Sequence, residues 1–223
     1  MKDLTPILTL AVFILSLNSS LAAERFADSH IHYNWDHQPE TSLQQAVDIL
    51  KNHDVKLTIV SSTPAELALE LRKHGGDWII PFFSPYIHES GKRDWYLDER
   101  VVELAEQGLE KGLYYGIGEV HFMNGFKPGI DNRIFQQLIK LAENYQVPVL
   151  IHIDSGNEIT FQKLCAARPK VKMIFAHAGG NLNPSHIENI LNSCSNAWID
   201  FAARDPWRYG GLTDENHILL AEW

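Results

Sequence analysis

Short apolar runs alternate with amphipathic segments along almost the whole chain, and no other feature of the sequence constrains the fold as strongly. The apolar runs read FADSHIH, KLTIVSS, WIIPFF, LYYGIGEVHF, VPVLIHID, VKMIFAHAGG and AWIDF. In the first interval between them, Leu43, Val47 and Leu50 recur at the spacing of one helical face. The sequence therefore predicts seven strands, each followed by a helix. We expect the helices near residues 43–50, 63–76, 97–112, 134–145, 184–192 and 212–223, with a further helix that Pro169 stops at Arg168.

Near-continuous apolar strands are typical of a parallel sheet that is buried on both faces, either an open doubly wound sheet or a closed barrel. Polar residues distinguish the two, because they stand at the C-terminal ends of strands one, four, five and six: His30, His32, Glu119, His152 and His177. In a barrel these ends meet at one mouth, whereas an open sheet spreads them along an edge. We therefore predict an α/β fold of the TIM-type (β/α)₈ barrel class.

The predicted barrel lacks its eighth strand in this chain. Only the predicted helix at 212–223 follows the seventh strand, and a seven-stranded barrel leaves the edges of its first and last strands unpaired. We expect either that the chain is a C-terminally incomplete piece of a longer one or that a partner closes the barrel.

Two histidines in the first strand indicate a metal site. Residues i and i+2 of a strand point to the same face, so we expect His30 and His32 to enter the barrel mouth together while Ile31 faces the helices. Two imidazole nitrogens form half of a tetrahedral site for Zn²⁺ or a similar divalent ion. The ligands expected from other strands are Glu119, His152 and His177.

Two further residues have a weaker claim on the same pocket. His121 lies two residues after Glu119, and Asp154 lies two residues after His152, so strand alternation turns both toward the mouth. We predict that Asp154 contacts the substrate or orients a histidine. The other six histidines are expected on the surface or hydrogen-bonded in the core.

Composition narrows the function classes. The 223 residues carry a net charge of −9 and no cluster of Lys and Arg, so we expect no binding to nucleic acid or to an anionic membrane surface. With 45% hydrophobic residues, the chain can bury one sizeable core, and we expect a single domain over residues 23–223. The expected partner is a small-molecule substrate, and the oligomeric state is left open, a homo-oligomer included.

The first 22 residues match a secretory signal peptide. Lys2 precedes a mostly apolar run at residues 6–17, and the Ser-Leu-Ala at residues 20–22 has the small-x-small pattern of a cleavage site. The apolar run is short for a bilayer span, and an uncleaved anchor is the alternative. We expect a secreted or periplasmic protein with no membrane contact after cleavage.

The two cysteines, Cys165 and Cys194, would meet an oxidising compartment after export. Both fall on or just after consecutive predicted helices, which makes a disulfide one alternative. Their spacing matches neither a metal-binding knuckle nor a CxxC redox pair. Two inert buried thiols are the expected state.

The sequence resembles the amidohydrolase superfamily, in particular its TatD-like and amidohydrolase-related metal-dependent hydrolases. The resemblance covers residues 26–223 and is carried by DSHIH, GIGEV, LIHID and FAHAGG. It implies metal ligands at His30, His32 and His152 and a bridging ligand at Glu119. It also implies that His177 either binds a second metal or handles protons or substrate as a catalytic residue.

The chain departs from the family pattern at one position. That pattern includes an aspartate at the end of an eighth strand, as metal ligand and general base, and no such strand is predicted here. Asp200 belongs to the seventh strand, and we do not expect it to replace the missing aspartate.

The resemblance implies a hydrolase that uses metal-activated water on an amide, ester or lactone-type substrate. The cofactor expected is one or two divalent ions, with Zn²⁺ the first choice. A metal-dependent decarboxylase of the same superfamily is the alternative, although Glu119 disfavours it because a mononuclear site needs no bridging carboxylate. A third hypothesis, suggested by the absent strand, is a metal-binding fragment without turnover.

Overall fold

The computed structural model describes residues 26–122, 128–153, 157–180 and 182–204. The predicted signal peptide, the predicted helix at 212–223 and Asp154 lie outside these ranges. Within the described residues, strands and helices alternate in the predicted order.

The strands are β1 (Phe26–Ile31), β2 (Val55–Ser61), β3 (Ile79–Phe82), β4 (Ile117–Phe122), β5 (Val149–Ile153), β6 (Met173–Phe175) and β7 (Ala197–Ile199). The α-helices are α1 (Leu43–Asn52), α2 (Glu66–Gly75), α3 (Arg100–Glu110), α4 (Arg133–Tyr145), α5 (Glu158–Ala167) and α6 (Pro184–Ser193). Three short 3₁₀ helices are η1 (Gly91–Arg93), η2 (Trp95–Leu97) and η4 (Ala176–Gly179).

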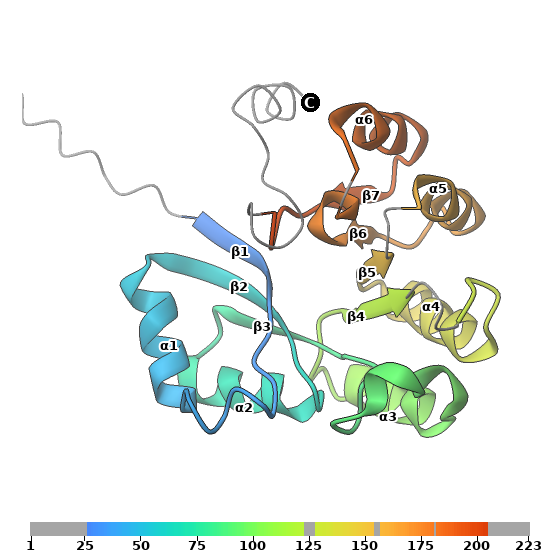
Figure 1. Ribbon diagram of the computed structural model, residues 1–223. Coiled ribbons are helices and arrows are strands. Elements are labelled where there is room, and N and C mark those ends of the chain that lie inside the picture. Colours follow the sequence, from blue (N-terminus) through green and yellow to red (C-terminus); the bar gives the residue numbers. More distant parts are fainter. Residues whose placement is uncertain (1–25, 123–127, 154–156, 181, 205–223) are drawn as a thin grey trace, which may run out of the picture.

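All strand pairs are parallel and follow the order of the chain. One sheet has the order β1-β2-β3 and a second the order β4-β5-β6-β7. A parallel bridge between Phe83 and Ile117 links them, so the strands form one curved array with the helices on its outside (Figure 1). Within the described residues no backbone pairing joins β1 to β7. The arrangement is that of the predicted barrel, left unclosed between its first and seventh strands.

Local sequence signals start the helices. The Ser42 side chain accepts the backbone N–H of Gln45, and the Gln45 side chain accepts the N–H of Ser42, so a capping box begins α1. Asn132 caps α4 and Asn183 caps α6 through side-chain oxygens that accept backbone N–H groups. None of the helices in the described part of the chain is long and apolar enough to cross a membrane.

Beneath the histidines, several inward-pointing strand residues form an apolar cluster. Phe82, Leu150 and Ala176 form a buried cluster, against which Ile59 and Ile174 pack. Leu150 lies two residues before His152 and therefore on the same face of β5. The cluster forms an apolar floor below the space that the histidines enter, and a low-dielectric surrounding strengthens electrostatic interactions there.

The sixth strand is shorter than the sequence predicts. A strand is expected over residues 171–180, but only Met173–Phe175 is extended. At His177 and Ala178, φ is +58° and +47°, which are left-handed values that a strand does not adopt. The backbone N–H groups of both residues donate to Asp200 instead of to a neighbouring strand, and for this reason the strand ends early.

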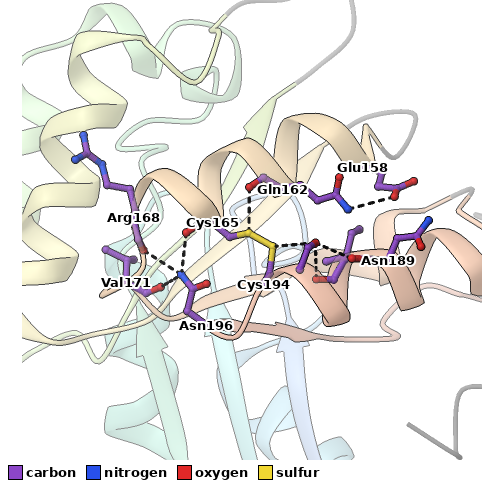
Figure 2. Close-up of a disulfide and its surroundings, with 10 residues drawn as sticks. Glu158, Gln162, Cys165, Arg168, Val171, Asn189, Cys194 and Asn196 are labelled. Carbon is purple, nitrogen blue, oxygen red and sulfur yellow. Dashed lines mark hydrogen bonds between the residues drawn. A yellow bond between two sulfur atoms is a disulfide. The ribbon is translucent and has the colours of Figure 1, made fainter.

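The expectation of two free thiols is wrong. Cys165 of α5 and Cys194, which follows α6, form a disulfide with their Cα atoms 5.8 Å apart (Figure 2). Close by, the Asn196 side-chain amide donates to the carbonyl oxygens of Arg168, at 3.0 Å, and Val171, at 2.8 Å. Both cysteines are buried, as expected, but their pairing depends on how α5 packs against α6, which cysteine spacing does not encode.

Removal of this disulfide should lower the free energy of unfolding by about 3 kcal/mol, because it closes a loop of 29 residues in the unfolded chain. Urea unfolding of wild-type protein and of a Cys165→Ala/Cys194→Ala variant measures the difference. Reductant should destabilise the wild type and leave the double variant unchanged. Equal stability of the two proteins under oxidising conditions would contradict a structural role for the bond.

Candidate metal centre

The five side chains predicted to bind metal lie together at the C-terminal ends of β1, β4, β5 and β6. Glu119 is at the centre, with its carboxylate oxygens 3.1 Å from His152 Nδ1, 3.1 Å from His177 Nε2 and 3.2 Å from His32 Nε2. His30 Nε2 is 3.5 Å from Glu119 Oε2. Four of the five side chains are at most 7% exposed, whereas that of His32 is 32% exposed. His32 therefore marks the side of the site that solvent reaches.

Three of the imidazoles are held by acceptors on their outer side. The Nδ1 atom of His30 lies 3.1 Å from the Asp200 carboxylate, that of His32 lies 2.7 Å from the carbonyl oxygen of Ser61, and that of His177 lies 2.8 Å from the carbonyl oxygen of Ala202. Carbonyl and ionised carboxylate oxygens only accept hydrogen bonds, so each Nδ1 must carry the proton. In the neutral rings each Nε2 then presents a lone pair.

These lone pairs point at one another and at Glu119. His30 Nε2 and His32 Nε2 are 3.1 Å apart, and two nitrogens bound to one tetrahedral zinc ion lie about 3.3 Å apart. Lone pairs that converge on a carboxylate repel one another unless a cation stands between them. The donor set and its spacing therefore fit a divalent metal ion.

Among the described residues, three groups of ligand atoms could hold an ion, and two of these groups share Glu119 while the third consists of His30, His177 and Asp200. Of the two that share Glu119, one is His30, His32 and Glu119, the other is Glu119, His152 and His177, and the ligand atoms of each lie within 4.8 Å of one another. Glu119 is common to these two groups, so its carboxylate can bridge two ions. One or two ions are compatible with this geometry.

The charges at the site are coupled. Burial lowers the pKa of His30, but hydrogen bonds to the carboxylates of Asp200 and Glu119 outweigh burial and raise that pKa to about 10. Burial raises the pKa of Glu119, yet the surrounding histidines, with His121 first among them, outweigh it and hold the pKa well below its ordinary value. Glu119 is therefore an anion. Without a metal ion, His30 is a cation that holds protons on both ring nitrogens at neutral pH.

Asp200 was not among the predicted site residues, and the structure places it beside them. It directly follows β7, is 3% exposed, and places Oδ2 3.1 Å from His30 Nδ1. The sequence signal was present, because Asp200 ends a strand as the other site residues do. The sequence placed Asp200 in the seventh strand, whereas β7 ends at Ile199 and Asp200 is the next residue, at the barrel mouth.

His121 belongs to the site in a different role from the other histidines. Its backbone N–H donates to the Tyr86 hydroxyl oxygen at 2.9 Å, and its Nδ1 lies 2.5 Å from the same oxygen. The hydroxyl proton therefore goes to Nδ1, which leaves the proton of the neutral His121 ring on Nε2, 3.3 Å from Glu119 Oε2. Burial lowers the pKa of His121 and raises that of Tyr86, in keeping with two neutral groups. His121 thus orients the carboxylate, and the sequence offers no signal for Tyr86.

Close packing also positions Glu119. Its backbone N–H donates to the Ser61 hydroxyl at 2.6 Å. The preceding residue, Gly118, has φ +124°, and a Cβ there would lie 2.2 Å from the Leu150 carbonyl oxygen. The glycine in GIGEV is therefore required for β4 to approach β5 closely enough to bring Glu119 next to His152.

Comparison with known proteins identifies the fold. No family model and no curated protein sequence matches the chain, but solved structures do. A protein assigned as an amidohydrolase from Staphylococcus aureus is 16% identical, with 88% of this chain and 83% of that chain covered and a TM-score of 0.54. The chain therefore shares its fold with this solved structure.

Two further solved structures share this fold. A protein assigned as a 2-pyrone-4,6-dicarboxylic acid hydrolase from Acinetobacter baumannii is 16% identical, with 89% and 77% of the two chains covered and a TM-score of 0.52. A 2,6-dihydroxybenzoate decarboxylase is 12% identical, with 81% and 82% covered and a TM-score of 0.54. Both hydrolases and a decarboxylase are thus among the structures that resemble this chain.

Metal binding should become tighter as the pH rises from about 6 to about 9. The pKa of metal-free His30 is about 10, so an entering ion must displace its proton, and each pH unit below 10 lowers the apparent affinity about tenfold. Calorimetric titration in buffers of different ionisation enthalpy should report about one proton released per ion. An affinity that does not change with pH would contradict the displacement of a proton from His30 by the ion.

Proposed function

We propose that this protein is a metal-dependent hydrolase of the amidohydrolase superfamily, with zinc as its ion. The observation that carries the proposal is the convergence of three imidazole lone pairs and the Glu119 carboxylate, each ring locked from behind by an acceptor. Nitrogen and carboxylate ligands of this kind are those that Zn²⁺ prefers. The fold shared with solved hydrolases supports the same assignment.

A bound divalent ion supplies Lewis acidity, which activates water and polarises the carbonyl oxygen of an amide, ester or lactone. The residues of this chain would bind the ion, orient its ligands and shape the space around it. Substrate would approach past His32, the most exposed of the five side chains, while the apolar floor under His152 keeps water out from below. The Tyr86–His121 pair holds one carboxylate oxygen of Glu119 in place.

His177 has two alternative roles, which depend on the number of ions. With two ions its Nε2, 3.1 Å from Glu119 Oε1, would bind the second. With one ion bound by His30, His32 and Glu119, His177 is placed to exchange a proton with the reacting groups or to stabilise negative charge on the substrate. Asp154, which lies outside the described residues, remains a proposed substrate contact.

Chelator should abolish hydrolysis of a panel of lactones, esters and amides, and Zn²⁺ should restore it. His152→Asn should lower kcat/KM at least about 100-fold by removal of a ligand. The matched control is His186→Asn, since the His186 side chain is 44% exposed on α6, and it should retain activity. Hydrolysis that survives complete metal removal would contradict the proposal.

A decarboxylase is the second candidate, favoured by the solved decarboxylase of the same fold. The bridging position of Glu119 between two ligand sets argues for the hydrolase. Incubation of the metal-loaded protein with hydroxybenzoic acids distinguishes the two, because only a decarboxylase releases CO₂. A protein that binds metal and shows neither activity would match the third hypothesis, a metal-binding fragment without turnover.

We also propose that the mature protein starts near residue 23 and acts on a small-molecule substrate in the periplasm or outside the cell. The Cys165–Cys194 disulfide supports export, because such bonds persist in oxidising compartments. Mass spectrometry of the protein expressed with its full N-terminus should find the first 22 residues removed. An intact N-terminus on protein recovered from the cytoplasm would contradict export.

A further inference from the structure

Asp200 makes side-chain hydrogen bonds both to His30 of β1 and to the backbone of the turn after β6. It directly follows β7, the last described strand. The two segments that it contacts carry His30 and His177, each of which belongs to one of the two ligand groups that share Glu119. The contacts of Asp200 can therefore affect the position of a ligand in each of these two groups.

Every oxygen of Asp200 accepts a hydrogen bond. Oδ2 is 3.1 Å from His30 Nδ1, while Oδ1 accepts the backbone N–H of His177 and of Ala202, each at 3.0 Å. The main-chain oxygen accepts the N–H of Ala178 at 2.7 Å. The residue is 3% exposed, so these donors have little access to water in its place.

The contact to His30 determines which ring nitrogen can bind metal. An ionised carboxylate beside Nδ1 keeps the proton on that atom, and Nε2 then faces His32 and Glu119 as a lone pair. If the acceptor were lost, the proton could move to Nε2, and the ring would no longer be a ligand from that side.

The contacts to the turn hold a backbone shape that His177 and Ala178 do not favour. Their φ values of +58° and +47° are left-handed, a conformation that is unfavourable for residues with a Cβ atom. Two N–H groups of this turn donate to Asp200. The turn brings His177 Nε2 to within 3.1 Å of Glu119, so Asp200 determines where this imidazole lies.

A direct role for Asp200 as a metal ligand fits these contacts less well. Its carboxylate does lie near His30 and His177 in a group that could hold an ion. Both carboxylate oxygens, however, already accept N–H groups of the protein, and an ion would have to displace the His30 proton that Oδ2 accepts. The positioning role uses all of the observed contacts.

We propose that Asp200 is a positioning residue that sets the tautomer of His30 and the turn of His177, and so preorganises the metal site from the seventh strand. This inference rests on the metal site of the proposed function. It gives the chain a carboxylate that orients the ligands from behind, in a place other than the eighth-strand position at which an aspartate is expected from the resemblance.

Asp200→Asn is the sharpest test, because asparagine has the same shape but only one side-chain oxygen. That oxygen can serve either His30 or the two N–H groups at Oδ1, and the amide nitrogen must then face a donor. We expect zinc affinity, measured by competition with a chromophoric chelator, to fall 10- to 100-fold. The matched control is Asp77→Asn, whose side chain is 98% exposed and which should bind zinc like the wild type.

A second measurement distinguishes the positioning role of Asp200 from a role in folding alone. Long-range ¹H–¹⁵N spectra of the histidine rings in zinc-loaded protein should show the His30 proton on Nδ1 in the wild type and its loss or relocation in Asp200→Asn. Should Asp200→Asn fail to fold, Asp200→Glu carries the test, since it keeps a carboxylate and should keep that proton while it binds zinc more weakly.

Unchanged affinity and an unchanged His30 proton in Asp200→Asn, or wild-type affinity in Asp200→Glu, would overturn the role of Asp200 and leave the metal site standing. Wild-type protein that binds no zinc would instead overturn the proposed function. The two failures are therefore distinguishable in one set of titrations.

Discussion

A buried carboxylate surrounded by imidazole nitrogens is the constraint on which the rest of this structure depends. Glu119 is 1% exposed, and removal of an ionised carboxylate from water costs several kcal/mol unless opposite charge and hydrogen bonds offset it. Neutral imidazoles that turn lone pairs toward it add repulsion. Protonation of His30, His32 and His177 would crowd three positive charges in one site, whereas a single divalent ion can satisfy nitrogen and carboxylate ligands together.

The fold meets this constraint from several strands at once. Parallel strands in chain order bring β1, β4, β5, β6 and β7 to one mouth, and the apolar cluster around Leu150 supports the site from below. A second layer of contacts then orients the ligands, with Ser61 behind His32, Asp200 behind His30 and Tyr86 behind His121. Removal of such outer contacts lowers metal affinity, because the contacts fix the tautomer and the direction of each ring.

Much of this could be predicted from the sequence, because strand alternation and the convergence of strand ends are strong rules. They bring His30, His32, Glu119 and His152 together without any structural information. The rule that strand ends converge also applies to Asp200. Asp200 was not predicted as a site residue because the family pattern has its aspartate at the end of the eighth strand. Tyr86 could not be predicted, since it lies in an irregular segment between β3 and α3 with no periodicity. The Cys165–Cys194 bond depends on helix packing, and the left-handed turn at His177 depends on contacts with Asp200 that appear only after folding.

The most direct measurement of the central claim is an anomalous difference map at the zinc absorption edge, from crystals grown with Zn²⁺. The account predicts a peak about 2.0–2.2 Å from Nε2 of His30 and His32 and from a carboxylate oxygen of Glu119, alone or with a second peak that shares Glu119 with His152 and His177. A map with no peak at this mouth, or with zinc only on exposed histidines such as His186, would contradict it.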